Sequence, residues 1–266
     1  MFTYPEIDPV AVSLGPLKVH WYGLMYLLAF VLAYVLSRVR ARDAASPVKP
    51  QQVDDLIFYA ALGVIAGGRV GYMIFYAPGT LIADPLSLFK IWDGGMSFHG
   101  GLIGVLVAMA YHARTVGRRF FEISDFLAPM APLGLGAGRI GNFINGELWG
   151  KVTDSPLGFM LPNGEVRHPT QLYEAFLEGL VLFAALWWFS AKPRPKMAVS
   201  GLFLLLYGVF RFAVEFVRVP DIQYDYLAFG WLTMGQVLST PMILIGILLI
   251  VLAYRTQDRA EVKQPA

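Results

Sequence analysis

The sequence predicts an all-α integral membrane protein with about seven transmembrane helices. Composition is the first reason: 56% of the 266 residues are hydrophobic and only 15% are charged, whereas about a quarter of an average soluble domain is charged. The second reason is that seven apolar runs have roughly the 17–25 residues needed to cross a hydrocarbon core about 30 Å thick. We therefore expect one polytopic domain over residues 1–266, with a mean hydropathy of +0.55.

The seven apolar runs follow one another along the chain. The first is apolar except for His20 at its edge, and the last is free of acidic and basic residues. The second is interrupted by Gly67, Gly68 and Arg69, and the third begins just before His99. The fourth ends in a glycine-rich stretch around Arg139. The fifth opens with two glutamates that weaken its first turns, and the sixth holds an arginine and a glutamate. The predicted spans are 19–37, 56–76, 97–113, 123–144, 172–189, 198–217 and 231–254.

Basic residues are distributed unevenly between the two sets of loops. The segments 37–53, 114–120 and 191–197 and the C-terminal tail together carry thirteen Lys and Arg residues, and the opposite loops carry five. Because cytoplasmic loops hold the excess, we predict that the N-terminus is outside and the C-terminus is in the cytoplasm. Residues 145–171 then form a small external loop region. Its Pro- and Gly-rich composition is compatible with a short hairpin.

This topology brings the charged groups of the spans to one depth. Spans two, four and six run outward, and each has an arginine five to seven residues before its outer end, roughly 8–10 Å below the boundary. A histidine starts the third span, and two glutamates lie close to outer ends. The six groups are Arg69, His99, Arg139, Glu147, Arg211 and Glu215. Ionisable groups at membrane depth are costly and usually mark a functional site.

Arg139 and Arg211 are candidates for an anion site. A guanidinium group offers paired donors to phosphate and stays charged at any relevant pH. The alternative is a structural ion pair, for which Glu147 and Glu215 are the natural partners. The common depth of two arginines and a histidine favours a phosphate site. Arg69 is a weaker candidate, because it is also explained as an anchor of its own span.

His99 is a candidate general base, since an imidazole titrates near neutral pH. The alternative is an interfacial histidine that bonds to a backbone carbonyl. Glycines on its C-terminal side, in F-H-G-G-L-I-G, favour the base because they let a substrate approach closely. Tyr22 lies near the outer end of the first span and is a further candidate, although Trp21 and Tyr22 also suit an aromatic belt at the membrane interface.

Several kinds of site are disfavoured. The chain has no cysteine, which excludes disulfides, a cysteine nucleophile and thiolate metal ligands. It has no H-E-x-x-H or G-x-S-x-G motif, and its net charge of +2 argues against a nucleic-acid partner. We expect neither a metal nor a cofactor. The residues alone leave two classes open: an enzyme acting on a phospholipid head group, or a non-catalytic binder or transporter of an anionic lipid.

Several motifs along the chain resemble, in order, those of the prolipoprotein diacylglyceryl transferase family. The most specific is G-R-I-G-N-F-I-N-G-E-L-W-G at Gly138–Gly150. The others are W-Y-G-L-M-Y (21–26), G-G-R-V-G-Y (67–72), W-D-G-G-M-S-F-H-G-G-L-I-G (92–104), R-H-P-T-Q-L-Y-E (167–174) and Y-G-V-F-R-F-A-V-E-F-V-R (207–218). The resemblance covers essentially the whole chain, although the loop 151–167 is short for a family whose external insert varies.

The resemblance implies a reaction and a location. In this family the diacylglyceryl group of phosphatidylglycerol passes to the lipobox cysteine thiol of a preprolipoprotein. A thioether forms and glycerol phosphate leaves, in the first step of bacterial lipoprotein maturation. We therefore expect a multi-pass protein of the bacterial inner membrane whose site faces the outer leaflet. Its expected partners are phosphatidylglycerol, the signal peptide that carries the lipobox cysteine, and the bilayer.

The same resemblance suggests roles for the candidate residues. The thiol must become a thiolate, and the departing phosphate must be stabilised as its charge grows. We expect Arg139 to be the main phosphate ligand with support from Arg211, and His99 to be the base or a group that orients the head group. The remaining candidates, which bind the lipid or orient the arginines, are Asn142, Asn145, Glu147, Glu215, Tyr22, Tyr207 and Arg69.

Overall fold

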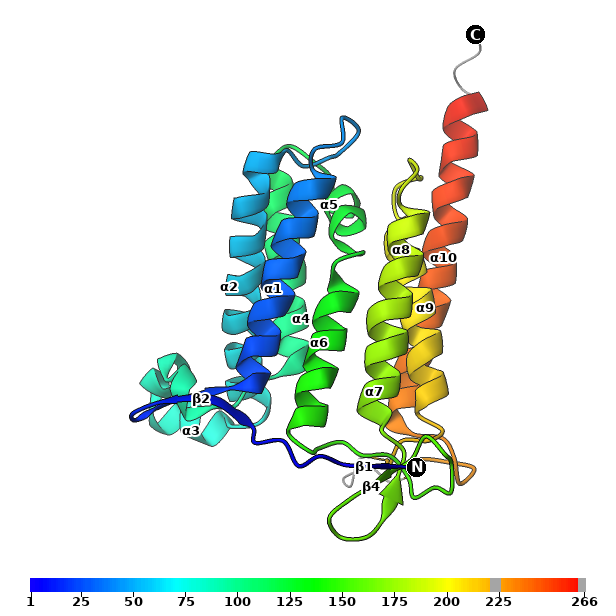
Figure 1. Ribbon diagram of the computed structural model, residues 1–266. Coiled ribbons are helices and arrows are strands. Elements are labelled where there is room, and N and C mark those ends of the chain that lie inside the picture. Colours follow the sequence, from blue (N-terminus) through cyan, green and yellow to red (C-terminus); the bar gives the residue numbers. More distant parts are fainter. Residues whose placement is uncertain (221–225, 263–266) are drawn as a thin grey trace. The chain divides into compact units, whose positions relative to one another are not determined.

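The computed structural model describes residues 1–220 and 226–262, and most of these residues are helical (Figure 1). The chain forms two compact units. The first comprises Met1–Ala33 and Leu127–Ala266, and the second comprises Tyr34–Phe126. Helix α1, Trp21–Arg40, contributes its first part to one unit and its last turns to the other.

Four helical stretches are long and apolar enough to cross a membrane. They are α1, α2 (Pro50–Phe75), the stretch Thr170–Phe189 and, within α10 (Met234–Val262), the residues Met234–Gln257. Helix α9, Ala198–Val214, is apolar but shorter. Large hydrophobic side chains on these helices are exposed: Leu27 on α1 and Leu244 on α10 are each more than half accessible. Apolar surface on the outside of a helix is suited to lipid rather than to water.

The second unit is built around two helices joined by an irregular segment. Helix α2 packs along α4, Phe98–Thr115, and the contact is lined by glycines on both helices. A side chain at Gly71 would lie 2.8 Å from the Cα atom of Gly100, so this approach requires small residues. Between α2 and α4 lie α3 (Pro78–Ala83) and two short 3-10 turns, η1 (Pro85–Phe89) and η2 (Ile91–Asp93); α5 (Phe120–Leu127) follows α4.

Three helical rods and α10 form the core of the first unit. Helix α6 is Ala131–Ile144, and the second rod runs without a break through α7 (Thr170–Glu174), the π-helix η3 (Ala175–Val181) and α8 (Leu182–Phe189). Helix α9 packs against this rod through Leu182, Leu186 and Val199. On its other side α9 contacts α10, where the glycine pair Gly201 and Gly246 allows close approach.

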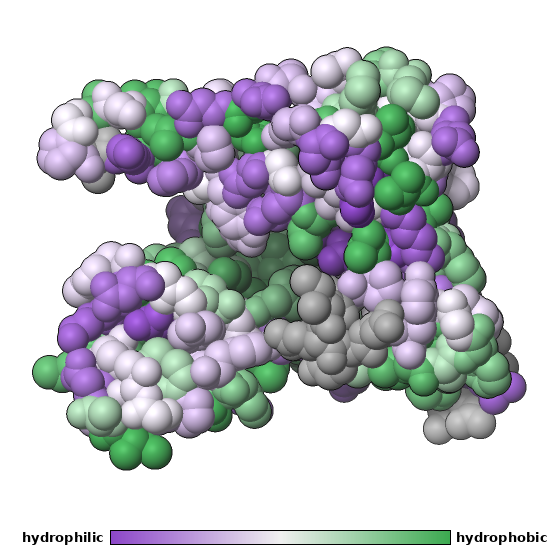
Figure 2. Space-filling model, turned by 90° about the horizontal axis from the view of Figure 1, so that it is seen from below, coloured by the Kyte–Doolittle hydropathy of each residue, from purple (hydrophilic) through white to green (hydrophobic). Residues whose placement is uncertain are grey.

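Short strands lie at one end of the first unit. β1 (Phe2–Thr3) pairs in parallel with β4 (Phe159–Met160), and β4 pairs antiparallel with β5 (Val166–Arg167). A separate antiparallel hairpin joins β2 (Val10–Leu14) to β3 (Leu17–His20). The face seen from this end mixes hydrophilic with hydrophobic residues (Figure 2). Such a mixture is typical of segments that leave the hydrocarbon.

The described helices overlap every predicted span, with two differences in detail. The predicted span 123–144 is two helices, because α5 ends at Leu127 and α6 begins at Ala131. Pro129 and Pro132 explain the break, since proline cannot donate the backbone hydrogen bond that a continuous helix needs. The predicted span 172–189 contains a full turn of π-helix. Within the loop 145–171, strands β4 and β5 form a short antiparallel hairpin of the kind that the composition of the loop allowed.

The contact between α6 and η3 depends on two glycines and is directly testable. A Cβ atom at Gly136 would lie 3.0 Å from the Cα atom of Gly179. We expect Gly136→Ala to lower the free energy of unfolding by about 1–3 kcal/mol, as overpacking does, measured by thermal unfolding in detergent. Gly138→Ala on the same helix is the control, because nothing lies within 4 Å of its added Cβ. Equal melting temperatures for the two variants would contradict the close contact.

Candidate functional site

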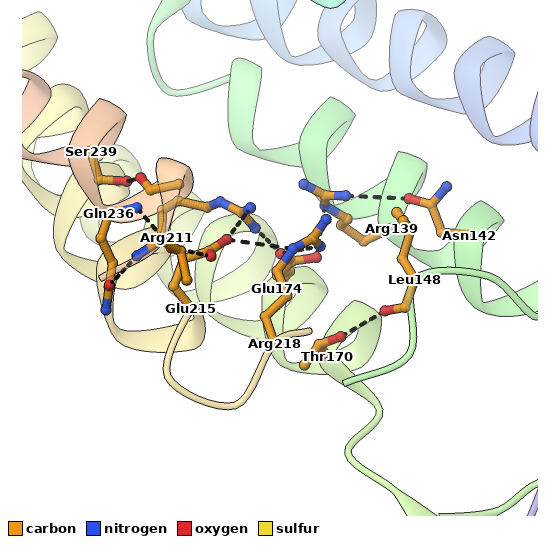
Figure 3. A network of polar contacts seen from close by, with 12 residues as sticks. Arg139, Asn142, Leu148, Thr170, Glu174, Arg211, Glu215, Arg218, Gln236 and Ser239 are labelled. Carbon is orange, nitrogen blue, oxygen red and sulfur yellow. Dashed lines mark hydrogen bonds and ion pairs between the residues drawn. The ribbon is translucent and has the colours of Figure 1, made fainter. Parts of the chain in front are cut away.

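A buried carboxylate at the start of the second rod joins three arginines. Glu174 is fully buried, and its Oε2 atom lies 3.1 Å from Nε of Arg139 on α6. Its Oε1 atom pairs with Arg211 on α9 and lies 3.2 Å from Nη1 of Arg218, which follows α9 (Figure 3). One carboxylate therefore connects side chains from three segments that are far apart in the sequence.

Glu215 is the second carboxylate of this cluster and ties it to α10. It forms an ion pair with Arg211, and its Oε1 atom lies 3.4 Å from Nε of Arg218. The hydroxyl of Thr233 donates a hydrogen bond of 2.6 Å to its Oε2 atom. Gly235 leaves the space that the carboxylate fills, since a side chain there would collide with Glu215. The start of a helix also favours a negative charge, so α10 stabilises Glu215.

The first turn of α10 is fixed by its own side chains. The backbone N–H of Thr233 donates to Oε1 of Gln236 at 3.0 Å, and the N–H of Gln236 donates to the Thr233 hydroxyl oxygen at 3.2 Å. This reciprocal pair is a capping box, which satisfies backbone donors that a helix start leaves free. Thr233 therefore does two things: it caps α10 and it holds the Glu215 carboxylate.

The loop after α6 is fastened to the start of α7. The Thr170 hydroxyl donates to the carbonyl oxygen of Leu148 at 2.7 Å, and the side chain of Gln171 donates to the carbonyl oxygen of Glu147. Leu148 has φ = 62°, an unusual value for a residue with a side chain. Thr170 and Gln171 are both fully buried. These bonds fix α6, which carries Arg139, relative to α7, which carries Glu174.

A second loop contact positions Arg218. The N–H of Gly150 donates to the carbonyl oxygen of His168, and the N–H of Lys151 donates to that of Val217, each at 2.8 Å.

Burial lowers the pKa of the Arg218 guanidinium, but from a starting value so high that the group stays charged at neutral pH. Burial also lowers the pKa of His168, which favours its neutral form. Arg218 therefore contributes a permanent positive charge.

Arg139 differs from the other two arginines in having donors to spare. Within residues 1–220 and 226–262, its contacts are the ion pair with Glu174 and a long hydrogen bond of 3.5 Å from Nη1 to Oδ1 of Asn142. Arg211 and Arg218 each contact both Glu174 and Glu215. The Arg139 side chain is also the most accessible of the three, at 23%. Arg139 is therefore the arginine best able to bind an added anion.

The predicted polar residues beside Arg139 form a small network of their own. Nδ2 of Asn142 donates to Oε1 of Glu147 at 2.8 Å, and Nδ2 of Asn145 donates to the same oxygen at 3.3 Å. Glu147 is exposed. The expected pairing of an arginine with Glu215 is present, whereas Arg139 pairs with Glu174 and Glu147 accepts from asparagines instead. Glu147 therefore orients Asn142, which in turn contacts Arg139.

Two predicted tyrosines, Tyr22 and Tyr207, lie on different helices of the first unit. The ring of Tyr22 on α1 packs where Gly141 has no side chain, and its hydroxyl lies 3.4 Å from that of Tyr26. Tyr207 lies one turn before Arg211 on α9, and its ring stacks on Phe203. Tyr22 is thus close to the turn of α6 that carries Arg139, and Tyr207 is close to the Arg211 end of the cluster.

Arg69 and His99 belong to the second unit. The Arg69 guanidinium donates to backbone carbonyl oxygens of the segment between α2 and α4. These acceptors belong to Ser87, Leu88, Gly94 and Gly95. Such contacts favour the anchoring role over substrate binding. His99 is exposed in the first turn of α4, and its ring lies against that of Phe98 with centroids 5.7 Å apart.

Two members of the cluster, Glu174 and Arg218, are not among the site residues predicted from the sequence. Glu174 weakens the first turns of the fifth predicted span, and Arg218 lies in a predicted loop. Glu174 is nevertheless at the same depth as Arg139, because the fifth span starts at the same outer side. The motif R-H-P-T-Q-L-Y-E, which ends on Glu174, was a second signal.

An apolar groove opens beside the cluster in the first unit. It has a volume of about 500 Å³ and is lined by α1, α6 and the start of the second rod, including Met25, Ile140, Leu172 and Phe176. Among the described residues, no group of three or more His, Asp or Glu side chains converges as a metal site requires. The arrangement offers a cation with free donors next to a hydrophobic groove.

These features define a class of protein: a helical membrane protein with a site suited to an anionic amphiphile. Comparison with known proteins identifies the family. The family model described as "Prolipoprotein diacylglyceryl transferase" matches residues 9–252, and the chain belongs to this family.

Similar proteins cover almost the whole chain. A protein of Methylococcus capsulatus is 64% identical over 257 residues, which is 96% of this chain and 98% of that protein. A protein of Coxiella burnetii is 59% identical over 97% of this chain and 100% of its own length. A protein of Pseudomonas paraeruginosa is 56% identical over 99% of both. Each is named phosphatidylglycerol–prolipoprotein diacylglyceryl transferase.

The central role of Glu174 leads to a stability prediction. We expect Glu174→Gln to destabilise the protein by about 3–5 kcal/mol, because it leaves buried arginine charge without its partner. Thermal unfolding in detergent measures this loss. Glu165→Gln is the matched control: it breaks the ion pair with Arg167, in which the Glu165 side chain is 43% accessible, and we expect no measurable change. A melting temperature for Glu174→Gln as high as that of the control would contradict the central role.

Proposed function

We propose that this chain transfers the diacylglyceryl group of phosphatidylglycerol to the lipobox cysteine thiol of a preprolipoprotein, forming a thioether and releasing glycerol phosphate. The observation that carries the proposal is the identity of 56–64% with proteins named for this activity, over at least 96% of the chain. The site described above supports it, because the reaction needs a cation for a phosphate and an apolar surface for a lipid.

Arg139 is the proposed ligand of the lipid phosphate. Its unused guanidinium donors suit the paired oxygens of a phosphate diester. Arg211 supports Arg139 indirectly, because both arginines pair with the same carboxylate, Glu174. Arg211 partly neutralises that carboxylate, so more of the positive charge of Arg139 remains available to the phosphate. Asn142 and Asn145 lie beside Arg139 in the proposed head-group region and offer amide hydrogen bonds to glycerol or phosphate oxygens.

The apolar groove next to Arg139 suits an acyl chain. It is lined by side chains of α1, α6 and the second rod, and it begins one residue beyond Arg139 at Ile140. A lipid whose phosphate binds Arg139 would place a chain along this apolar surface. Because the chain of a bilayer lipid is already in hydrocarbon, the groove contributes position and van der Waals contact rather than a hydrophobic driving force.

The proposed chemistry breaks one C–O bond and forms one C–S bond. The cysteine thiolate attacks the diacylglyceryl carbon that bears the phosphate oxygen, and glycerol phosphate leaves with the bonding electrons. The phosphate passes from one negative charge toward two, so a fixed cation at its oxygens stabilises the transition state more than the ground state. His99 is the proposed acceptor of the thiol proton, because its side chain is exposed in the first turn of α4. Gly100, which follows it, packs against α2 and does not provide the space for a substrate that the sequence led us to expect.

The proposed topology has seven spans, with the N-terminus outside and the C-terminus in the cytoplasm of a bacterial cell. The four long apolar helices supply four spans; α4, the α5–α6 pair and α9 supply the others. Support comes from the distribution of basic residues, thirteen in one set of loops against five in the other. In the inner membrane this places the arginine cluster toward the outer leaflet, where a signal-peptide cysteine arrives.

A direct assay distinguishes this proposal from a non-catalytic lipid binder or transporter. The purified protein is incubated with phosphatidylglycerol and a lipobox peptide. Release of glycerol phosphate together with a diacylglyceryl-modified peptide is expected. Binding of the lipid without either product would favour the binder and overturn the transferase.

The role of Arg139 predicts a loss of transition-state stabilisation on substitution. We expect Arg139→Gln to lower kcat/KM by about 100- to 1,000-fold, the usual effect of removing one charged or hydrogen-bonding group from a developing anion. Transfer of labelled diacylglyceryl to the lipobox peptide measures it. Arg118→Gln, an arginine that is 47% exposed in its pair with Glu122, is the control. Near-normal transfer by Arg139→Gln would exclude Arg139 as the phosphate ligand.

The proposed base predicts a loss of rate on substitution. A glutamine amide cannot accept the thiol proton, so we expect His99→Gln to lower kcat/KM by about 100-fold near neutral pH. Initial rates between pH 6 and 8 measure it. A fully active His99→Gln variant across that range would rule out His99 as the base.

A further inference from the structure

Glu178 is a buried carboxyl group to which the mechanism above gives no role. It lies in the π-helix η3, four residues after Glu174, and its accessible surface is zero. Within residues 1–220 and 226–262, neither of its carboxyl oxygens has a hydrogen-bond partner. Buried polar groups nearly always have one, so this side chain requires an explanation.

The groups that face Glu178 belong to the arginine cluster. Glu174 precedes it on the same rod, Arg139 lies on α6, Tyr207 and Arg211 lie on α9, and Arg218 follows α9. The three arginines are already engaged by two other carboxylates, Glu174 and Glu215. Glu178 therefore sits beside positive charge without a direct bond to any of it, and its nearest acidic neighbour repels a second negative charge.

The surrounding packing keeps Glu178 away from water. Its neighbour in the chain, Gly179, is buried against Gly136 of α6, so closely that a side chain on either glycine would collide with the other. A carboxylate held there without a hydrogen bond would lack both water and a bonded cation, which is the costliest state for this group. A protonated carboxyl group carries no charge and avoids most of that cost.

The protonation state of Glu178 decides the net charge of the cluster. Three arginines and two ionised glutamates leave one positive charge uncompensated when Glu178 is neutral. If Glu178 were ionised, the cluster would be neutral and would have no net attraction for an anion. The phosphate diester of phosphatidylglycerol carries one negative charge, which matches the cluster with a neutral Glu178.

We propose that Glu178 keeps a proton, and that this proton preserves the single positive charge with which the cluster binds the phosphate diester. The proposal rests on the phosphate-binding function proposed above. In this proposal Glu178 does not touch the lipid. It is a positioning residue that acts through Arg139 and Arg211, because its protonation state sets the net charge of the cluster to which they belong. Its place in a π-helix agrees with this role, since single π-helical turns are rare and frequently occur at functional sites.

Infrared spectroscopy tests the proton directly. Protein labelled with ¹³C-glutamate in detergent should show a shifted carbonyl band of a protonated carboxyl group at neutral pH, and this band should disappear as the pH rises. Glu178→Gln should remove the band, whereas Glu165→Gln, which changes an exposed carboxylate, should leave it. Absence of the band from the wild type would overturn the proposal, whether or not Glu178→Gln folds.

Lipid binding tests the consequence. As Glu178 loses its proton, KM for short-chain phosphatidylglycerol in micelles should rise in the wild type, by up to about tenfold per pH unit, with a smaller change in kcat. Glu178→Gln mimics the protonated form, so its KM should stay flat over the same pH range. Superimposable KM profiles for the two proteins would overturn the proposal, as would loss of lipid binding at every pH by folded Glu178→Gln.

The infrared and lipid-binding measurements test the role of Glu178 independently of the transferase activity. His99 is present in both proteins, so the comparison isolates the effect of Glu178. Should the purified protein release no glycerol phosphate, the same pH dependence is measured as the Kd for the short-chain lipid. A titrating Glu178 band with pH-dependent lipid binding would then support the charge role while the transferase assignment fails.

Discussion

The structure of the first unit depends on one constraint: positive charge buried among apolar helices must be compensated by a small number of carboxylates. Glu174 and Glu215 together engage Arg139, Arg211 and Arg218. Removing a partner from a buried pair costs far more than a surface pair contributes. The cluster therefore ties α6, the second rod and α9 to one another, although these segments are distant in the sequence. Helix packing through glycine brings the backbones close, and the ion pairs fix which faces meet.

Much of the surrounding structure serves to place these side chains. Thr170 and Gln171 bind the backbone after α6, the Gly150 loop holds the chain before Arg218, and Thr233 caps α10 while it bonds to Glu215. Each of these bonds satisfies a backbone or carboxyl group that would otherwise be buried without a partner. The result is a rigid set of charges in which Arg139 alone keeps both accessibility and donors. Rigidity matters here because a preorganised cation stabilises a developing anion without moving.

The sequence predicted the helical membrane class and several members of the cluster, for reasons that are local. Apolar runs locate helices, and rise per residue gives the depth of Arg139 and Arg211 within them. Pairing is not local: that Arg139 contacts Glu174 rather than Glu147 depends on how three helices pack. The anchoring of Arg69 by carbonyl groups also requires the folded loop. The π-helix at 175–181 leaves no clear sequence signal. A mostly apolar segment has the same composition whether its backbone bonds follow the α-helical or the π-helical pattern.

The balance of charge gives the site its chemistry. A site with a carboxylate for every arginine would be stable but would have no net attraction for a phosphate. A site with fewer carboxylates would carry more uncompensated positive charge among the helices, which is costly. Three arginines paired with two carboxylates leave a single excess positive charge, which suits a diester before the reaction and attracts the dianionic leaving group more strongly. Glu178 lies where a sixth charge would cancel that excess. Keeping this carboxyl neutral in an apolar turn therefore maintains both the stability of the helices and their attraction for phosphate.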